Sequence, residues 1–98
     1  MLLPERPVAL VLMSTEACHL CEQAQALLLP LQGQLSEDLY LDDIAYSDDL
    51  LNRYGVRIPV LLHETSGAEL DWPFDAATLR HWLQQRGCLA PSLPSEFL

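Results

Sequence analysis

The sequence contains no lysine, and its five basic residues are the arginines Arg6, Arg53, Arg57, Arg80 and Arg86. Its 14 acidic residues outnumber them, so that the formal net charge is −9. Proteins that bind nucleic acid carry a basic patch, and anionic membrane surfaces attract clusters of basic residues. The composition therefore argues against nucleic acid and membrane surfaces as partners and favours a solvated acidic surface.

A long hydrophobic run at the N-terminus is also missing. The apolar run over residues 8–13 has six residues and follows Pro4, Glu5, Arg6 and Pro7. A signal peptide needs a basic start and a longer apolar stretch, and a membrane helix needs roughly 20 apolar residues. We therefore expect a cytoplasmic protein. Its 98 residues predict a single domain, with a core over about residues 8–87 and an extended tail over 88–98.

Cysteine is scarce as well, because the chain has only Cys18, Cys21 and Cys88. Proteins of a reducing compartment rarely build a framework of structural disulfides. Cys18 and Cys21 are separated by two residues, and a CxxC pair in such a compartment is more often catalytic or metal-binding.

The apolar pattern predicts where this pair lies in the fold. Residues 8–13 are short and apolar, as in a strand that is buried on both faces. From Cys18 onward the spacing becomes that of a helix, whose apolar face carries Leu20, Ala24, Leu27, Leu28 and Leu31. Pro30 is expected to kink or end this helix, and Gly33 marks its latest expected end.

The rest of the chain predicts a mixed sheet. The further elements are a strand over residues 39–45, a helix over 47–55, a strand over 56–63, a turn over 64–67, a strand over 68–72 and a helix after Asp75. Ser47 and Asp75 are suitable N-caps, and Gly55 and Gly87 suit helix C-termini. Pro59 lacks an N–H group and belongs at the start of its strand or on an unpaired side. The β-α-β-α-β-β-α order predicts four strands in one sheet with helices on both faces.

The predicted helix start gives Cys18 a chemical advantage. Unpaired N–H groups and the helix dipole stabilise a thiolate there and lower its pKa. Cys21 lies one helical turn further on and can resolve a mixed disulfide formed on Cys18. A protonated His19 would lower the pKa of Cys18, whereas Glu16 would raise it.

Two other interpretations of the pair stay open at this point. A zinc site would need two more ligands, and His19, His63, His81 and Cys88 show no second paired spacing, so we predict no metal site. The two cysteines could also be inert packing residues. Cys88 is expected to be a partly buried, inert cysteine rather than a regulatory thiol, and His63 and His81 to be surface or hydrogen-bonded histidines.

The segments "CHLC" after the first strand and "RIPVLL" at the third resemble the thioredoxin fold, most closely small bacterial glutaredoxin-like proteins. The resemblance covers about residues 8–87. It implies a thioredoxin-like α/β fold, Cys18 as nucleophile, Cys21 as resolving cysteine and Pro59 as a cis-proline packed against the disulfide. It also implies that the exposed backbone of Ile58 pairs with an extended substrate or with glutathione.

Several residues depart from the glutaredoxin pattern. His19 and Leu20 replace the usual active-site proline, and Glu16 lies in the loop where a lysine is usual. The segment "LDWPFD" replaces the Gly-Gly turn before the last helix, so that only Asp75 is retained, as a helix cap. Trp72 in this segment belongs either to a packed turn or to an apolar platform for a ligand.

Three hypotheses of function follow. The first is a glutaredoxin-like thiol–disulfide oxidoreductase with Cys18 and Cys21 as catalytic residues. It acts as a monomer on a disulfide-containing protein or small molecule, with no permanently bound cofactor and glutathione as a candidate reductant. The second is a non-catalytic module that binds a partner through Ile58, Pro59 and the turn at residues 72–74. The third, an iron–sulfur cluster shared between two chains through glutathione, is less favoured because the glutathione groove looks incomplete.

Overall fold

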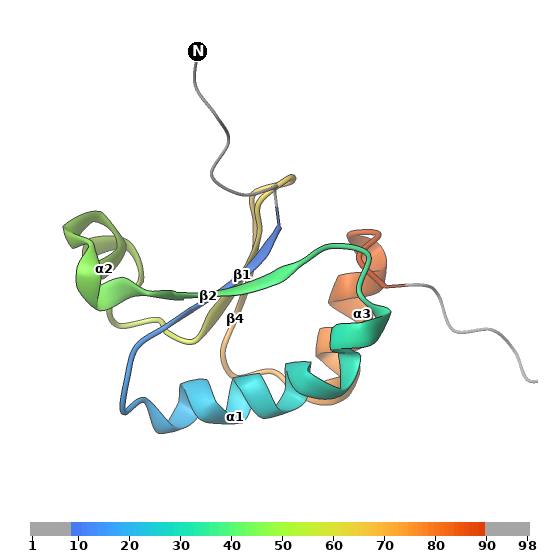
Figure 1. Ribbon diagram of the computed structural model, residues 1–98, viewed down its shortest axis with the longest axis horizontal. Helices are drawn as coiled ribbons and strands as arrows, with labels where there is room; N and C mark the ends of the chain where they lie inside the picture. Colours follow the sequence, from blue (N-terminus) through green and yellow to red (C-terminus); the bar gives the residue numbers. More distant parts are fainter. Residues whose placement is uncertain (1–8, 90–98) are drawn as a thin grey trace, which may run out of the picture.

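Strand β1 (Leu10–Ser14) lies inside the sheet of the computed structural model, which describes residues 9–89. It pairs in parallel with β2 (Leu39–Asp43) and antiparallel with β3 (Val60–His63). β3 pairs antiparallel with β4 (Ala68–Asp71), so the strand order is β2-β1-β3-β4 (Figure 1). Every residue of β1 is buried, which explains why this strand is almost continuously apolar.

Helices cover both faces of the sheet. In the described part of the chain these are α1 (His19–Leu28), α2 (Asp48–Tyr54) and α3 (Ala76–Gln85). Two 3₁₀ helices accompany them: η1 (Leu29–Gln34) continues α1, and η2 (Ile44–Tyr46) precedes α2. α1 and α3 pack on one face and α2 on the other (Figure 1). The predicted mixed sheet with helices on both faces is confirmed. Between residues 9 and 89, no helix is long and apolar enough to cross a membrane.

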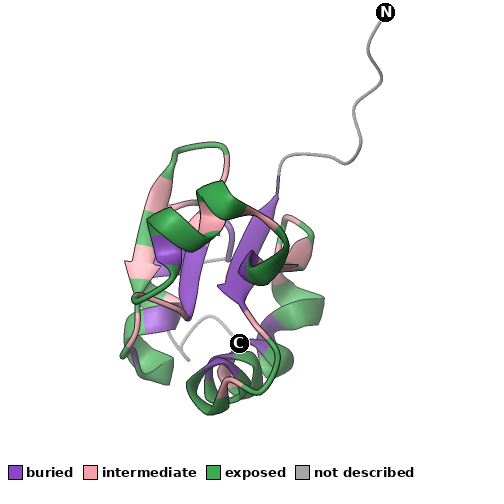
Figure 2. Cartoon of the chain, turned by 90° about the vertical axis from the view of Figure 1, so that its left-hand side faces the viewer, coloured by how far each residue is buried: buried purple, intermediate pink, exposed green. Residues whose placement is uncertain are grey.

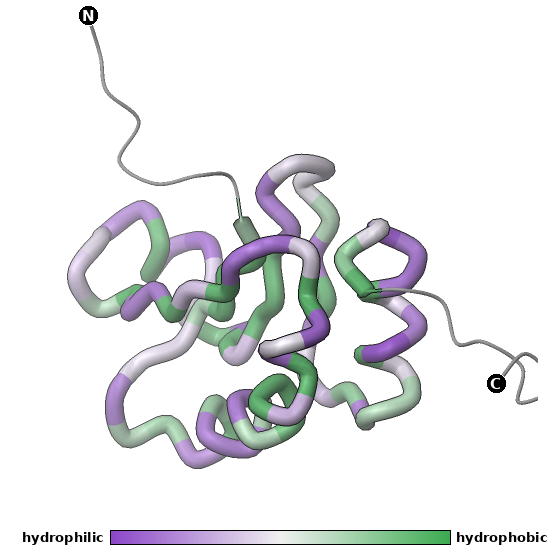
Figure 3. The backbone as a smooth tube through the Cα atoms, turned by 45° about the vertical axis from the view of Figure 1, so that its right-hand side comes forward, coloured by the Kyte–Doolittle hydropathy of each residue, from purple (hydrophilic) through white to green (hydrophobic). Residues whose placement is uncertain are grey.

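Each face of the sheet has its own hydrophobic core, because successive residues of a strand point to opposite faces. The larger core lies under α1 and α3, and among its buried residues are Leu10, Leu12, Ala24, Leu28, Leu31, Leu61, Leu79, Trp82 and Leu83. The smaller core lies under α2 and contains Val11, Met13, Ile44, Tyr54 and Val60. Burial is continuous along β1, whereas the outward faces of the helices are exposed (Figure 2). Hydrophobic residues gather along the central strands and hydrophilic ones along the outer turns (Figure 3).

The predicted N-caps are confirmed. The Ser47 hydroxyl accepts a hydrogen bond from the Leu50 N–H group at 3.3 Å, at the start of α2. The Asp75 carboxylate accepts one from the Thr78 N–H group at 2.7 Å, at the start of α3. Each side chain satisfies a donor that the first turn of the helix leaves without a partner.

The Ser47 cap gives a testable effect on stability. Ser47→Ala removes the acceptor for the Leu50 N–H group and is expected to lower the free energy of unfolding by about 1 kcal/mol. Ser47→Asp keeps an acceptor at the same position and is the matched control, expected to retain most of the stability. Urea unfolding followed by circular dichroism measures both, and equal losses in the two variants would contradict the cap.

The two glycines at helix ends do different things. Gly87 follows α3 with φ of +74°, in the left-handed region that glycine adopts without strain. Gly55 has a right-handed helical backbone, and a Cβ atom there would lie 2.5 Å from the carbonyl oxygen of Leu51. The position of Gly55 was therefore predicted correctly, but the structure requires glycine there because of close packing.

Some element boundaries differ from the prediction. β2 ends at Asp43, whose carboxylate accepts the Ala45 N–H group at 2.9 Å and starts η2, so that Ile44 turns into the smaller core. Helical turns continue past Gly33 as far as Gln34, because the 3₁₀ geometry of η1 accommodates Pro30 in its first turn.

The predicted core residues also need correction. Leu20 is 45% exposed, and Cys21 takes the buried position in the first turn of α1 instead. The core continues past residue 87, because Cys88 and Leu89 are buried and Leu89 forms a β-bridge with Leu35. The rest of the predicted tail, residues 90–98, lies outside the described residues.

Candidate active site

The loop from β1 to α1 places Cys18 at the N-terminus of α1. β1 ends at Ser14, and Cys18 is the N-cap of the helix. Ala17 has φ of 58°, in the left-handed region that residues other than glycine rarely adopt. This conformation turns the chain from the strand into the helix within a few residues. Backbone outliers of this kind cluster at functional sites, which directs attention to the cysteine that follows.

The sulfur of Cys18 is held by the first turn of the helix. Its Sγ atom accepts a hydrogen bond from the Cys21 N–H group at 3.2 Å. N–H groups in a first turn have no partner within the helix, and the helix dipole places about half a positive charge there. This is the kind of environment that stabilises a thiolate over a thiol.

Cys18 and Cys21 form a disulfide, and their Cα atoms are 5.2 Å apart. Cys18 is half-buried, whereas Cys21 is only 1% exposed. An incoming molecule can therefore reach the sulfur of Cys18 but not that of Cys21. This arrangement of one accessible and one sheltered sulfur is what a nucleophile and a resolving cysteine require.

The sheet register brings a second group of predicted residues to the same end of the sheet. Met13 pairs with Val60, so Pro59 lies beside the end of β1, where the loop to Cys18 begins. Pro59 is buried, and its carbonyl oxygen accepts a hydrogen bond from the Trp72 N–H group at 3.2 Å. The Ile58–Pro59 and Trp72–Pro73 peptide bonds are both cis.

The backbone of Ile58 is less available for pairing with a substrate than the resemblance implied. Its side chain is half-buried against the smaller core, and its N–H group donates to the carbonyl oxygen of Tyr54 at 3.1 Å. An extended substrate therefore cannot use this N–H group unless the contact with Tyr54 breaks.

The turn before α3 is packed. Phe74 is 6% exposed and belongs to the larger core, and Trp72 is half-buried against it, with ring centroids 4.9 Å apart in an edge-to-face contact. Asp75 is engaged as the cap of α3, and its hydrogen bond from the Thr78 backbone lowers the pKa of its carboxyl group. Of the two interpretations of residues 72–74, the structure supports a packed turn over an open apolar platform.

The two residues predicted to modulate the pKa of Cys18 lie on the surface. Glu16 is exposed in the loop, and His19 is exposed at the first position of α1. Water and salt screen charges in such positions, so that their influence on the sulfur is small beside that of the adjacent N–H group.

Arg57, which the sequence analysis did not single out, ties the chain before Pro59 to β4 through ion pairs. Its guanidinium lies 2.6 Å from the Glu69 carboxylate and 2.7 Å from that of Asp71. Hydrogen bonds from Arg57 and Tyr54 lower the pKa of Glu69, whereas burial raises the pKa of Tyr54. The alternation along β4 was the available signal, because residues 69 and 71 share one face of the strand.

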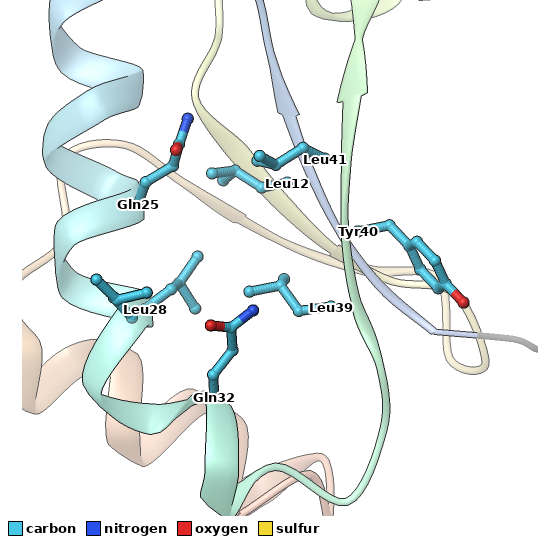
Figure 4. A pocket seen from close by; sticks show the side chains of 8 residues that line it. Leu12, Gln25, Leu28, Gln32, Leu39, Tyr40 and Leu41 are labelled. Carbon is cyan, nitrogen blue, oxygen red and sulfur yellow. The ribbon is translucent and has the colours of Figure 1, made fainter.

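A groove of about 310 Å³ lies elsewhere, between α1 and the edge strand β2 (Figure 4). Leucines form most of its lining, with Gln25 and Gln32 at the helix side, and Tyr40 points away from it across β2 (Figure 4). Gln25 is seven residues beyond Cys18, or roughly 10 Å along a helix. The groove is therefore separate from the disulfide.

Cys88 is fully buried, more deeply than the partly buried position that the sequence analysis predicted. Desolvation and the nearby Glu37 carboxylate raise the pKa of its thiol to about 11. His63 is buried and hydrogen-bonded to Ser66 and Glu37, whereas His81 is exposed on α3. His63 and the neighbouring Cys88 lie at the end of the sheet opposite the disulfide, because His63 pairs with Leu10, the first residue of β1.

The difference in burial predicts selective labelling. Iodoacetamide at pH 8 is expected to modify Cys18 in the reduced, folded protein and to leave Cys88 unmodified, because Cys88 is 0% exposed. Unfolding in guanidinium chloride is the control and should expose all three cysteines. Peptide mass spectrometry distinguishes the sites, and rapid labelling of Cys88 in the folded protein would contradict this arrangement.

The four-stranded mixed sheet, the helices on its two faces and the CxxC pair at the start of α1 define a thioredoxin-fold protein. The family model described as "Glutaredoxin-like domain (DUF836)" matches residues 9–84. The chain belongs to this glutaredoxin-like family.

Solved structures of similar proteins agree with this assignment. The X-ray structure of target protein XcR50 from X. campestris is 40% identical, with a TM-score of 0.68 over 79% of this chain and 97% of that one. The solution structure of the same target gives 39% identity and a TM-score of 0.66, over 87% and 99%. Protein Ne2328 from Nitrosomonas europaea is 30% identical, with a TM-score of 0.63 over 84% and 98%. No curated protein matches the chain.

Proposed function

We propose that the protein is a thiol–disulfide oxidoreductase that uses Cys18 and Cys21. The observation that supports this most strongly is the hydrogen bond from the Cys21 N–H group to Cys18 Sγ, together with the difference in exposure between the two sulfurs. The thiolate is the nucleophile in disulfide exchange, and a helix N-terminus stabilises it.

The reaction starts from the reduced pair. The Cys18 thiolate attacks one sulfur of a substrate disulfide, the substrate S–S bond breaks, and the departing thiolate takes a proton from solvent. The Cys21 thiolate then attacks Cys18 Sγ, releases the second substrate thiol and closes the Cys18–Cys21 disulfide. Two electrons and two protons pass to the substrate, and two thiol equivalents from glutathione or a reductase restore the dithiol.

The substrate in this proposal is a disulfide-bearing protein or small molecule in the cytoplasm. No permanently bound cofactor takes part. The absence of a lysine near the CxxC pair weakens an electrostatic hold on glutathione, so glutathione enters as an electron donor, without a dedicated site. The packed turn containing Trp72 and Phe74 disfavours the alternative of a binding module that uses that turn as its contact surface.

A pH titration of Cys18 tests the proposal. The reduced protein is alkylated with iodoacetamide at a series of pH values, and mass spectrometry follows the rate at Cys18. A midpoint well under 8 is expected, against about 8.5 for an unperturbed thiol. A midpoint of 7 would raise the thiolate fraction at pH 7 from about 3% to about half.

The same titration in Cys88→Ala removes the third thiol and serves as the control. A midpoint near that of free cysteine, together with no turnover of small disulfides, would favour the binding module over the oxidoreductase. A colourless, iron-free preparation would exclude the shared cluster.

A further inference from the structure

Three side chains with metal-ligating atoms meet at the end of the sheet opposite the disulfide. Glu37 precedes β2, His63 is the last residue of β3, and Cys88 follows α3. Their ligand atoms all lie within 4.8 Å of one another. His63 is 4% exposed and Cys88 is 0% exposed, so the cluster is largely shielded from water.

The spacing of these atoms is close to that of a metal coordination sphere. His63 Nε2 lies 2.9 Å from Glu37 Oε2, and Cys88 Sγ lies 3.7 Å from the same oxygen. Tetrahedral zinc with nitrogen and oxygen ligands near 2.0–2.2 Å and sulfur near 2.3 Å separates its ligand atoms by about 3.3–3.6 Å. These two separations lie on either side of this range, and the three ligand atoms all lie within 4.8 Å of one another, so the side chains would have to shift to admit an ion.

A second observation points to a ligand at this place. Glu37 Oε1 is buried and has no hydrogen-bond partner among the described residues. A buried carboxylate oxygen without a partner is costly, and native proteins rarely leave one. Oε2 is the oxygen that faces His63 and Cys88, so a cation bound by both oxygens of the carboxylate would also give Oε1 the partner that it lacks.

The imidazole of His63 is also held in the orientation that a metal ligand needs. Its Nδ1 atom lies 2.7 Å from the Ser66 hydroxyl, which in turn accepts a hydrogen bond from the Ala68 N–H group at 3.2 Å. Metal-binding histidines usually anchor their second ring nitrogen in this way. Nε2 is thereby left facing Glu37 and Cys88.

We propose that Glu37, His63 and Cys88 bind one divalent cation of the zinc type, which ties β2, β3 and the chain after α3 together. The Cys88 thiol gives up its proton to solvent when the ion binds, and the resulting thiolate and the Glu37 carboxylate neutralise its two charges. The side chain of Glu37 is 24% exposed, which leaves a route from solvent to a fourth position filled by water.

Arg86 supplies the competing explanation. Its Nε atom is buried without a partner, and an ion pair with Glu37 would satisfy both groups without a metal. The guanidinium of Arg86 instead lies against the ring of Trp82, with its central carbon 5.1 Å from the ring centroid. The convergence of three different metal ligands therefore favours the cation.

The test uses the full chain with Cys18→Ser and Cys21→Ser, so that the dithiol cannot chelate metal. One equivalent of Co²⁺ is expected to bind and to give a thiolate-to-cobalt absorption band, which one equivalent of Zn²⁺ then removes. Zn²⁺ should raise the melting temperature and remain bound in a 1:1 ratio after gel filtration. Absence of binding at one equivalent would overturn the site.

Single substitutions in this background assign the ligands. Cys88→Ser, His63→Gln and Glu37→Gln should each weaken Zn²⁺ binding by about tenfold or more. His81→Gln changes an exposed histidine of α3 and should leave the affinity unchanged. If Cys88→Ser fails to fold, the partly exposed Glu37→Gln still gives the answer. Unchanged zinc affinity in Glu37→Gln would overturn the proposal. If the parent protein binds no zinc and Arg86→Gln lowers its stability, the ion pair between Glu37 and Arg86 is favoured instead.

Discussion

Cys18→Ser is expected to abolish disulfide reduction, whereas Cys21→Ser is expected to stop the reaction after its first step. Cys18 is the half-buried sulfur at the helix N-terminus, and Cys21 is sheltered behind it at 1% exposure. Without Cys18 no sulfur that a substrate can reach remains in the site. Without Cys21 the mixed disulfide on Cys18 has no internal thiol to resolve it.

Two measurements separate these outcomes. Turnover of a small disulfide should fall to background in Cys18→Ser, a loss on the order of 10³-fold or more for a missing nucleophile. Intact-mass spectrometry of Cys21→Ser after mixing with the disulfide should show one substrate half attached to the protein. Cys88→Ser is the matched control and should keep its activity, because Cys88 lies at the far end of the sheet. A mixed disulfide that forms on Cys21 in Cys18→Ser would reverse the assigned roles.

Leu61→Ala is expected to cause a large loss of stability. Leu61 lies in β3 at 0% exposure and packs in the larger core between the sheet, α1 and α3. Truncating a buried leucine to alanine lowers the free energy of unfolding by about 2–5 kcal/mol, because apolar burial is lost and a cavity is left behind. Domains of this size typically have only 5–15 kcal/mol of stability in total.

Leu41→Ala is the matched control for this truncation. Leu41 also lies in a strand, but β2 is the edge of the sheet and Leu41 is 54% exposed. Its truncation is expected to change the free energy of unfolding by less than about 1 kcal/mol. Urea unfolding measures both variants, and the comparison is valid if the slope with denaturant stays the same. Similar losses at the two positions would show that the sheet core does not dominate stability.

Both ends of the sheet now carry a chemical assignment. The loops after β1 and before β3 hold the dithiol end, because Met13 pairs with Val60 there. The starts of β1 and β2 and the end of β3 hold the Glu37–His63–Cys88 cluster. The strands between them separate the buried Cys88 from the half-buried disulfide.

Local sequence rules predicted much of the fold because they act over a few residues. Ser47 and Asp75 cap helices through contacts with residues three positions away, and Cys18 starts α1 through the same kind of contact. Where prediction failed, packing against the core decided the outcome. Leu20 fits the apolar period of α1, yet it lies on the surface because the core accommodates Cys21 instead.

The sequence by itself determined the strand and helix order, the dithiol at a helix start and the proline before the third strand, since spacing and capping are properties of neighbouring residues. Only the tertiary structure decided which side chains meet across the sheet. It joined Arg57 to Glu69 and Asp71, and it gathered Glu37, His63 and Cys88. The tertiary fold brings together residues that are between 12 and 51 positions apart, and no short-range pattern in the sequence records these contacts.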